Sequence, residues 1–246
     1  MNVSFRRVSI AVAIALAAVS AGLAQAADTA ATKGPQPGRA ALGGQIGSSY
    51  VFSGGDYADG AQPRLSFAGH FRYQIDRTWG WQFSPEFTWN GYVSHAQAPY
   101  ADAHFPGENL SKQHYITQFA GLGAQLQYFG GAPGSRWHIG AGPAIYRVVV
   151  QNHRKVVNDP VSKEDLKSAH LGATAEFGIE RLLKRLPNTA LEATVAWHMV
   201  FASDKTKFPS GWNSDPMLVE LRLGAHYYYD FRRPKPAGKG AKGLSK

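Results

Sequence analysis

Residues 216–231 read PMLVELRLGAHYYYDF, and their alternation decides the fold. The odd-numbered positions, from Met217 to Phe231, are all apolar or aromatic, whereas the even-numbered ones include Glu220 and Arg222. The exceptions on the even face are Leu218 and Tyr228. A period of two is typical of a β-strand with one apolar and one polar face. The stretch is far longer than the roughly 5–6 residues usual in soluble proteins, and it suits a tilted strand that crosses a bilayer.

The same alternation recurs along the chain from Arg39 onward. It predicts eight strands, over 39–52, 64–75, 79–93, 113–128, 136–150, 169–181, 189–202 and 216–231. Long polar connections alternate with short turns, which we place at 76–78, 130–134 and 182–188. Pro85 falls inside the third strand, and we expect a β-bulge there because proline removes a ladder donor.

The N-terminal residues 1–26 are typical of an export signal. Arg6 and Arg7 precede an apolar run, and Ala24-Gln25-Ala26 provides a small-residue cleavage site. We expect a flexible lead-in at 27–38, a barrel over 39–231 and a basic disordered tail at 232–246. No later segment is apolar enough for a spanning helix, and the absence of cysteine excludes disulfides, so burial and strand pairing must hold the exported chain together.

The formal net charge of +9 is concentrated at the two ends of the chain. The export signal holds two arginines and the tail holds six basic residues, which leaves a formal +1 for residues 27–231. The predicted barrel therefore offers no basic surface, and nucleic-acid binding is excluded as a function class.

Three regularities predict the architecture. Charges lie on the polar faces, which is the inverse of a soluble barrel whose apolar faces point inward. Long and short connections alternate, as in bacterial outer-membrane barrels with long external loops and short periplasmic turns. Aromatic residues gather at the strand ends joined by short turns, where a membrane-interface girdle belongs: Trp79, Trp81, Tyr128, Trp137, Tyr227 and Tyr229. We predict an all-β, eight-stranded antiparallel up-and-down transmembrane β-barrel in the bacterial outer membrane, with periplasmic termini.

The pattern resembles the small eight-stranded outer-membrane barrels typified by the OmpA membrane domain, OmpX and the opacity proteins. The resemblance covers roughly residues 39–231. The last strand also resembles the C-terminal assembly signal of outer-membrane proteins, on Arg222, Gly224, Tyr227, Tyr229 and Phe231. These resemblances imply the barrel-assembly machinery as a partner, together with outer-membrane lipid and lipopolysaccharide.

The candidate site is the polar lumen. Strand parity sends to it Arg64, Arg72, Glu86, Glu176, Glu180, Glu192, Glu220 and Arg222, along with His70, His138, His170, His198 and His226. An eight-stranded barrel is only wide enough for side chains to fill its interior, so these charges must be paired. We predict a closed polar plug, with Arg72 and Arg222 as its hubs.

An enzymatic alternative is a lipid A hydrolase. Some barrels of this size use a His-x-Ser pair on the seventh strand with a glutamate on the eighth. His198 and Glu220 occupy these strands, but Val200 stands where the serine would be, and Ser203 is the nearest serine. Without a hydroxyl beside the imidazole there is no activated nucleophile, so no catalytic residue is predicted.

No metal or cofactor is predicted from the sequence. The second connection carries His95, Asp102, His104, Glu108 and His114, but their spacing is irregular. The function expected is structural or surface interaction by a monomer, with any extracellular ligand bound at the loops 53–63, 94–112, 151–168 and 203–215, and a narrow pore for small solutes as the alternative.

Overall fold

The computed structural model describes residues 36–52, 61–93, 114–132, 134–152, 155–156, 158, 164–165, 167–202 and 217–230. The predictions for the export signal, for Phe231 and the tail, and for most of the four long connections lie outside these residues. Within the part of the chain described, no helix is long and apolar enough to cross a membrane.

Ten strands form a single sheet. The eight long ones are β1 (Arg39–Phe52), β3 (Arg64–Gln74), β4 (Trp79–Val93), β5 (His114–Ala132), β6 (Ser135–Asn152), β8 (Lys167–Leu183), β9 (Leu186–Val200) and β10 (Met217–Asp230). Two short strands, β2 (Ala61–Gln62) and β7 (Lys155–Val156), pair antiparallel with the last residues of β4 and β6, at the end with the long connections. The predicted eight barrel strands are confirmed.

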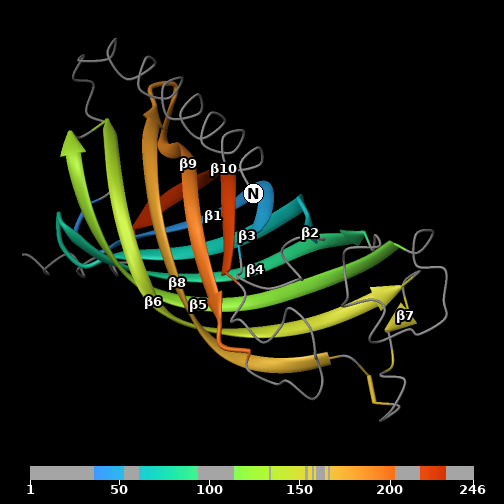
Figure 1. Ribbon diagram of the computed structural model, residues 1–246. Helices are drawn as coiled ribbons and strands as arrows, with labels where there is room; N and C mark the ends of the chain where they lie inside the picture. The colour runs from blue at the N-terminus through green and yellow to red at the C-terminus, as the bar shows by residue number, and fades with distance from the viewer. Residues whose placement is uncertain are drawn as a thin grey trace, which may run out of the picture.

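The sheet closes into a barrel (Figure 1). Each long strand pairs antiparallel with its sequence neighbours, and β1 pairs with β10 in an unbroken register from Arg39↔Asp230 to Phe52↔Met217. Closure satisfies the backbone groups of both terminal strands, which would otherwise be free edges. The predicted all-β antiparallel barrel is confirmed.

Two of the predicted turns are shorter in the structure. Strand β5 continues through Gly130 and Gly131, which pair with Trp137 and Arg136, so that only residues 133–134 connect β5 to β6. The basic segment 182–188 is mostly strand, with only Lys184 and Arg185 in the turn. The glycines and the basic residues of these two segments indicate turns in the sequence. In the structure, most residues of the two segments belong to strands, which lengthens the ladder at the expense of the turn.

The expected β-bulge at Pro85 is wrong. Opposite Pro85, the β3–β4 ladder lacks pairs between Ala68↔Glu86 and Phe71↔Phe83, yet the register is the same on both sides. The β5–β6 ladder has a similar gap beside Pro143, between Gly123↔Ala144 and Leu126↔Ala141. A missing proline N–H therefore interrupts pairing locally without an extra residue, because the other neighbour of each strand stays fully paired.

The two faces of the wall differ in polarity. Large apolar side chains are exposed on the outside of all eight long strands, for example Ile46, Leu122, Ile145 and Leu223. The inside is lined by buried glutamate, arginine, glutamine, threonine and histidine. The core of this protein is thus its polar lumen, the inverse of a soluble barrel.

Aromatic side chains mark the end of the barrel with the short turns. Trp79 on β4, Tyr128 on β5 and Trp137 on β6 are all exposed and contact one another across three adjacent strands, with ring centroids 5.2 and 5.7 Å apart. Tyr227 on β10 is exposed at the same end, and its hydroxyl accepts a hydrogen bond from Asn188. This arrangement fits the girdle expected at a membrane interface.

Candidate functional site

The structure brings seven of the eight predicted lumen residues into the barrel interior. Alternation along a strand sends every second side chain inward, so residues of equal parity on one strand share the lumen. Six of them are almost completely buried there: Arg72, Glu176, Glu180, Glu192, Glu220 and Arg222. The side chain of the seventh, Glu86, is 7% exposed. They form two clusters, one near the short turns and one nearer the long connections.

The placement predicted for Arg64 is wrong. Arg64 is exposed and lines a surface pocket with Leu65, Trp89 and Ile116. It is the first residue of β3, at the end of the barrel with the long connections. Parity alone directs its side chain inward, but the long side chain of an arginine at the start of a strand carries its charged group to solvent.

Arg72 is the centre of the cluster near the short turns. Its guanidinium donates to Glu180 Oε2 at 3.0 Å, to Glu192 Oε1 at 2.9 Å and to Gln82 Oε1 at 2.7 Å. Gln82 in turn donates to Glu176 Oε1 at 2.9 Å. Arg72 and Glu180 are each 1% exposed, and their strands β3 and β8 lie opposite each other in the ring of eight. This ion pair therefore bridges the full width of the lumen.

Glu180 collects further donors in the same cluster. Arg136 Nε donates to Glu180 Oε1 at 2.7 Å, and the Tyr228 hydroxyl donates to Oε2 at 2.8 Å. The Arg136 guanidinium also lies 4.3 Å from the centre of the Phe129 ring. A carboxylate with two arginines and a phenol is stabilised by charge-assisted hydrogen bonds that offset its removal from water.

Arg222 is the centre of the second cluster. It donates to Glu220 Oε2 at 2.6 Å and to Glu86 Oε2 at 3.0 Å, and its Nη2 lies 3.2 Å from His198 Nε2. Thr88 donates to Glu220 Oε1 at 2.6 Å, which ties β4 to β10. Arg72 and Arg222 each join three lumen side chains, as hubs would.

His198 does not face a serine in this cluster. Its Nδ1 lies 2.9 Å from the Tyr146 hydroxyl and 3.0 Å from Glu86 Oε1, and its Nε2 faces Arg222. Glu220 is occupied by Thr88 and Arg222. These contacts place His198 within the ion-pair network, whereas Ser203 lies outside the described residues.

Sequence reasoning missed several members of the network. Arg136 is not among the predicted lumen residues, although it shares the parity of His138 on β6. Tyr228 is an exception to the polar character of the even-numbered positions, yet it lies on the inward face of β10 with His226. Parity applied without regard to polarity would have found both. Uncharged members of the network are also absent from the prediction. Gln45, Gln82 and Gln127 donate to glutamates, and the Tyr146 hydroxyl contacts His198.

The residues of the assembly signal lie on both faces of β10. Arg222 points into the lumen, Tyr227 is exposed and Tyr229 is half-buried. A Cβ on Gly224 would lie 2.2 Å from the Gly44 carbonyl oxygen of the paired strand, so only glycine fits there. Phe231 lies outside the described residues. His170, near the other end of the barrel on β8, is half-buried beside Ser168.

The clusters together contain more negative than positive side chains. Three arginines face five glutamates, and four buried histidines lie among them, His70, His138, His198 and His226. Removing an unpaired carboxylate from water costs several kcal/mol. The lumen can therefore hold additional positive charge, either as protons on imidazole or as a bound cation.

Comparison with known proteins gives likenesses of shape. No protein-family model matches the chain, and no curated protein matches its sequence. Among solved structures, the chain is similar to Ail, the attachment invasion locus protein of Yersinia pestis, in complex with the heparin analogue sucrose octasulfate. The identity is 13%, the TM-score is 0.48, and the match covers 79% of this chain and 100% of that one.

Two further solved structures are similar to the chain. Neisserial surface protein A has 13% identity and a TM-score of 0.48, over 77% of this chain and 96% of that one. A major outer membrane protein from Thermus thermophilus has 14% identity and a TM-score of 0.48, over 77% and 99%. At such identities the likeness concerns the fold alone, that of small eight-stranded barrels.

Proposed function

We propose that the protein is a monomeric barrel of the bacterial outer membrane with a closed lumen, which acts as a scaffold that strengthens the envelope or presents its long connections to a surface ligand. The observation that carries the proposal is the inverted wall, apolar outside and ion-paired inside. An apolar exterior of this extent on a soluble protein would be a site of aggregation. In a bilayer the same side chains contact the lipid chains, where an apolar surface is favourable.

The closed lumen favours a scaffold over a pore. The Arg72–Glu180 pair bridges opposite walls, and the Arg222–Glu86 pair joins β10 to β4 at a second level. Both sets of side chains are nearly removed from solvent. A path for solutes would have to break these buried ion pairs, each of which is costly to disrupt.

Recognition is assigned to the connections 53–63, 94–112, 151–168 and 203–215 because loops on a rigid scaffold are where binding usually resides. Outer-membrane lipid, lipopolysaccharide and the barrel-assembly machinery are the further partners in this proposal. The basic tail 232–246 would then lie in the periplasm together with the short turns.

Trypsin digestion of intact cells, followed by mapping of the fragments, tests the proposal. The third connection offers Arg154, Lys155 and Lys163, and the turn between β8 and β9 offers Lys184 and Arg185. We expect cleavage in the connection and protection of the turn. Permeabilised cells serve as the control, in which the turn becomes accessible.

The other outcomes are distinct. Cleavage at the turn with the connections spared would invert the orientation. Complete protection, with release of the protein by osmotic shock, would indicate a soluble periplasmic barrel and would withdraw both the membrane location and the surface role.

A further inference from the structure

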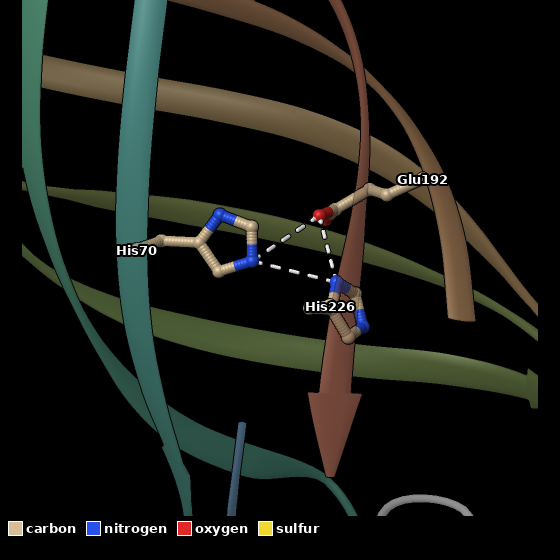
Figure 2. Close-up of side chains that lie close together, drawn as sticks. All are labelled: His70, Glu192 and His226. Carbon is tan, nitrogen blue, oxygen red and sulfur yellow. Dashed lines mark hydrogen bonds and ion pairs between the residues drawn. The ribbon is translucent and has the colours of Figure 1, made fainter. Parts of the chain in front are cut away.

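We infer that the lumen holds a divalent transition-metal ion, with Zn²⁺ as the best fit, bound by His70, Glu192 and His226. The three side chains come from β3, β9 and β10 and point toward one another inside the wall (Figure 2). This site is independent of the proposed surface role.

The separations between the three candidate ligand atoms match those around a tetrahedral ion. His70 Nε2 lies 3.4 Å from His226 Nδ1 and 3.7 Å from Glu192 Oε2, and His226 Nδ1 lies 3.2 Å from that same oxygen. Tetrahedral Zn²⁺ with bonds of ~2.0–2.1 Å requires ligand atoms ~3.3–3.4 Å apart. Two imidazoles and a carboxylate leave a fourth position for water.

A glycine brings the two imidazoles together. Gly43 on β1 pairs with His226 on one side and His70 on the other, so both histidines flank it on the lumen face. A Cβ on Gly43 would lie 2.4 Å from His226 Cβ and 2.6 Å from His70 Nε2. Only a residue without a side chain lets imidazoles from strands two apart meet over the strand between them.

The groups around the three ligands hold them in orientations that suit metal binding. His226 Nε2, which faces away from the site, lies 3.0 Å from Glu180 Oε2, the carboxylate–histidine arrangement that fixes the tautomer of a metal ligand. The other oxygen of Glu192, Oε1, accepts a hydrogen bond from Arg72 at 2.9 Å, which leaves Oε2 directed at the site. Gln45 also donates to Oε2, at 3.1 Å.

His70 gives an independent reason for a bound ion. It is 2% exposed, its Nδ1 has no hydrogen-bond partner among the described residues, and its Nε2 has only the two contacts at 3.4 and 3.7 Å. These lengths exceed the usual 2.7–3.2 Å of a hydrogen bond. A metal ion at Nε2 would supply the strong interaction that this buried imidazole lacks.

The charge of the surroundings also suits a cation. Arg72 and Arg136 face three carboxylates in this cluster, those of Glu176, Glu180 and Glu192, which leaves one negative charge in excess. The competing occupant is a proton on His226, which would then donate to both Glu180 and Glu192. Metal analysis separates the two.

The experiment is refolding of the full chain from urea into detergent micelles, with either Zn²⁺ or a chelator present. Metal content is then measured by mass spectrometry after removal of free ions. Because the ligands are buried, the metal should be taken up during folding. We expect about one Zn²⁺ per chain, the d–d absorption of a tetrahedral site with Co²⁺, and a higher unfolding midpoint with Zn²⁺ than with chelator.

Two variants locate the metal. His70→Ala should lose the bound Zn²⁺, the Co²⁺ bands and the stabilisation. The matched control His198→Ala removes another buried lumen histidine and should keep all three. If His70→Ala does not fold, His70→Gln, which retains a buried polar group, is used in its place.

The inference is overturned if wild-type protein refolded with Zn²⁺ retains none, which would leave a proton as the occupant. It is equally overturned if the His70 variant keeps the metal and the Co²⁺ bands. In that case the histidines of the long connections would bind the ion instead.

Discussion

Arg72 is paired with two buried carboxylates, so its removal leaves buried negative charge without its cation. We predict that Arg72→Ala lowers the free energy of unfolding by about 3–5 kcal/mol, because Glu180 and Glu192 would both remain buried in its absence. Arg222→Ala should act in the same direction through Glu86 and Glu220. Urea unfolding in detergent or lipid measures both.

Arg77 provides the control for this prediction. It lies exposed in the turn between β3 and β4, so that Arg77→Ala should change stability by no more than about 0.5 kcal/mol. Unchanged midpoints in both the Arg72 and Arg222 variants would show that the ion pairs do not hold the barrel together.

Gly43 and Gly44 are adjacent on β1, but a new Cβ would be crowded at Gly43 and have space at Gly44. Alanine substitutions at the two positions therefore form a test and its control. We predict that Gly43→Ala destabilises the barrel by about 1–3 kcal/mol, since its Cβ would press against His226 and the Ala225 carbonyl. At Gly44 the nearest atom to a new Cβ is the Ala68 carbonyl oxygen at 3.8 Å, so Gly44→Ala should be tolerated. Equal unfolding midpoints for the two variants would contradict the close contact at Gly43.

At the scale of the strand, the outer face should tolerate charge only near its ends. Leu223 lies in the middle of β10 and is 64% exposed, and Leu186 begins β9 and is 55% exposed. In a bilayer, Leu223→Arg should cost about 2–4 kcal/mol, whereas Leu186→Arg should cost about 0–1 kcal/mol.

Unfolding in lipid vesicles measures the difference between these two arginine variants. Equal costs would mean that the two leucines meet the same medium, and the proposed membrane span would have to be abandoned.

The alternation of residues specifies these strands well because membrane and lumen demand opposite polarities at successive positions. Strand ends are harder to predict. Gly130 and Gly131 have turn chemistry, yet they pair with β6, and only the folded ladder reveals this. The gap beside Pro85 likewise depends on the neighbouring strand β5, which stays paired where β3 does not.

The lumen is predictable as a set but not as a network. Parity identifies Arg72 and Glu180 as inward-facing from the sequence alone. Their meeting depends on how far successive strands are staggered around the barrel, which no single strand encodes. The convergence of His70, Glu192 and His226 depends on the same stagger and on Gly43 lying between the histidines.

For the whole molecule, the bridged lumen predicts an electrically silent barrel. We expect no stable single-channel currents from the protein in planar lipid bilayers, because ion pairs cross the lumen at two levels, from β3 to β8 and from β10 to β4. A water-filled porin in the same bilayers controls for detection, and antibody labelling of the bilayer confirms insertion. Reproducible current steps would instead establish the narrow pore.

The pairing of Arg72 with β8 and β9 also constrains the order of events during biogenesis. The guanidinium belongs to an early strand, whereas both of its carboxylate partners are made much later. Hairpins delivered to lipid one by one would each carry uncompensated charge into hydrocarbon. The chain must therefore remain in a wet, sheltered environment until its last strands arrive, and sealing of β1 against β10 must coincide with desolvation of the interior.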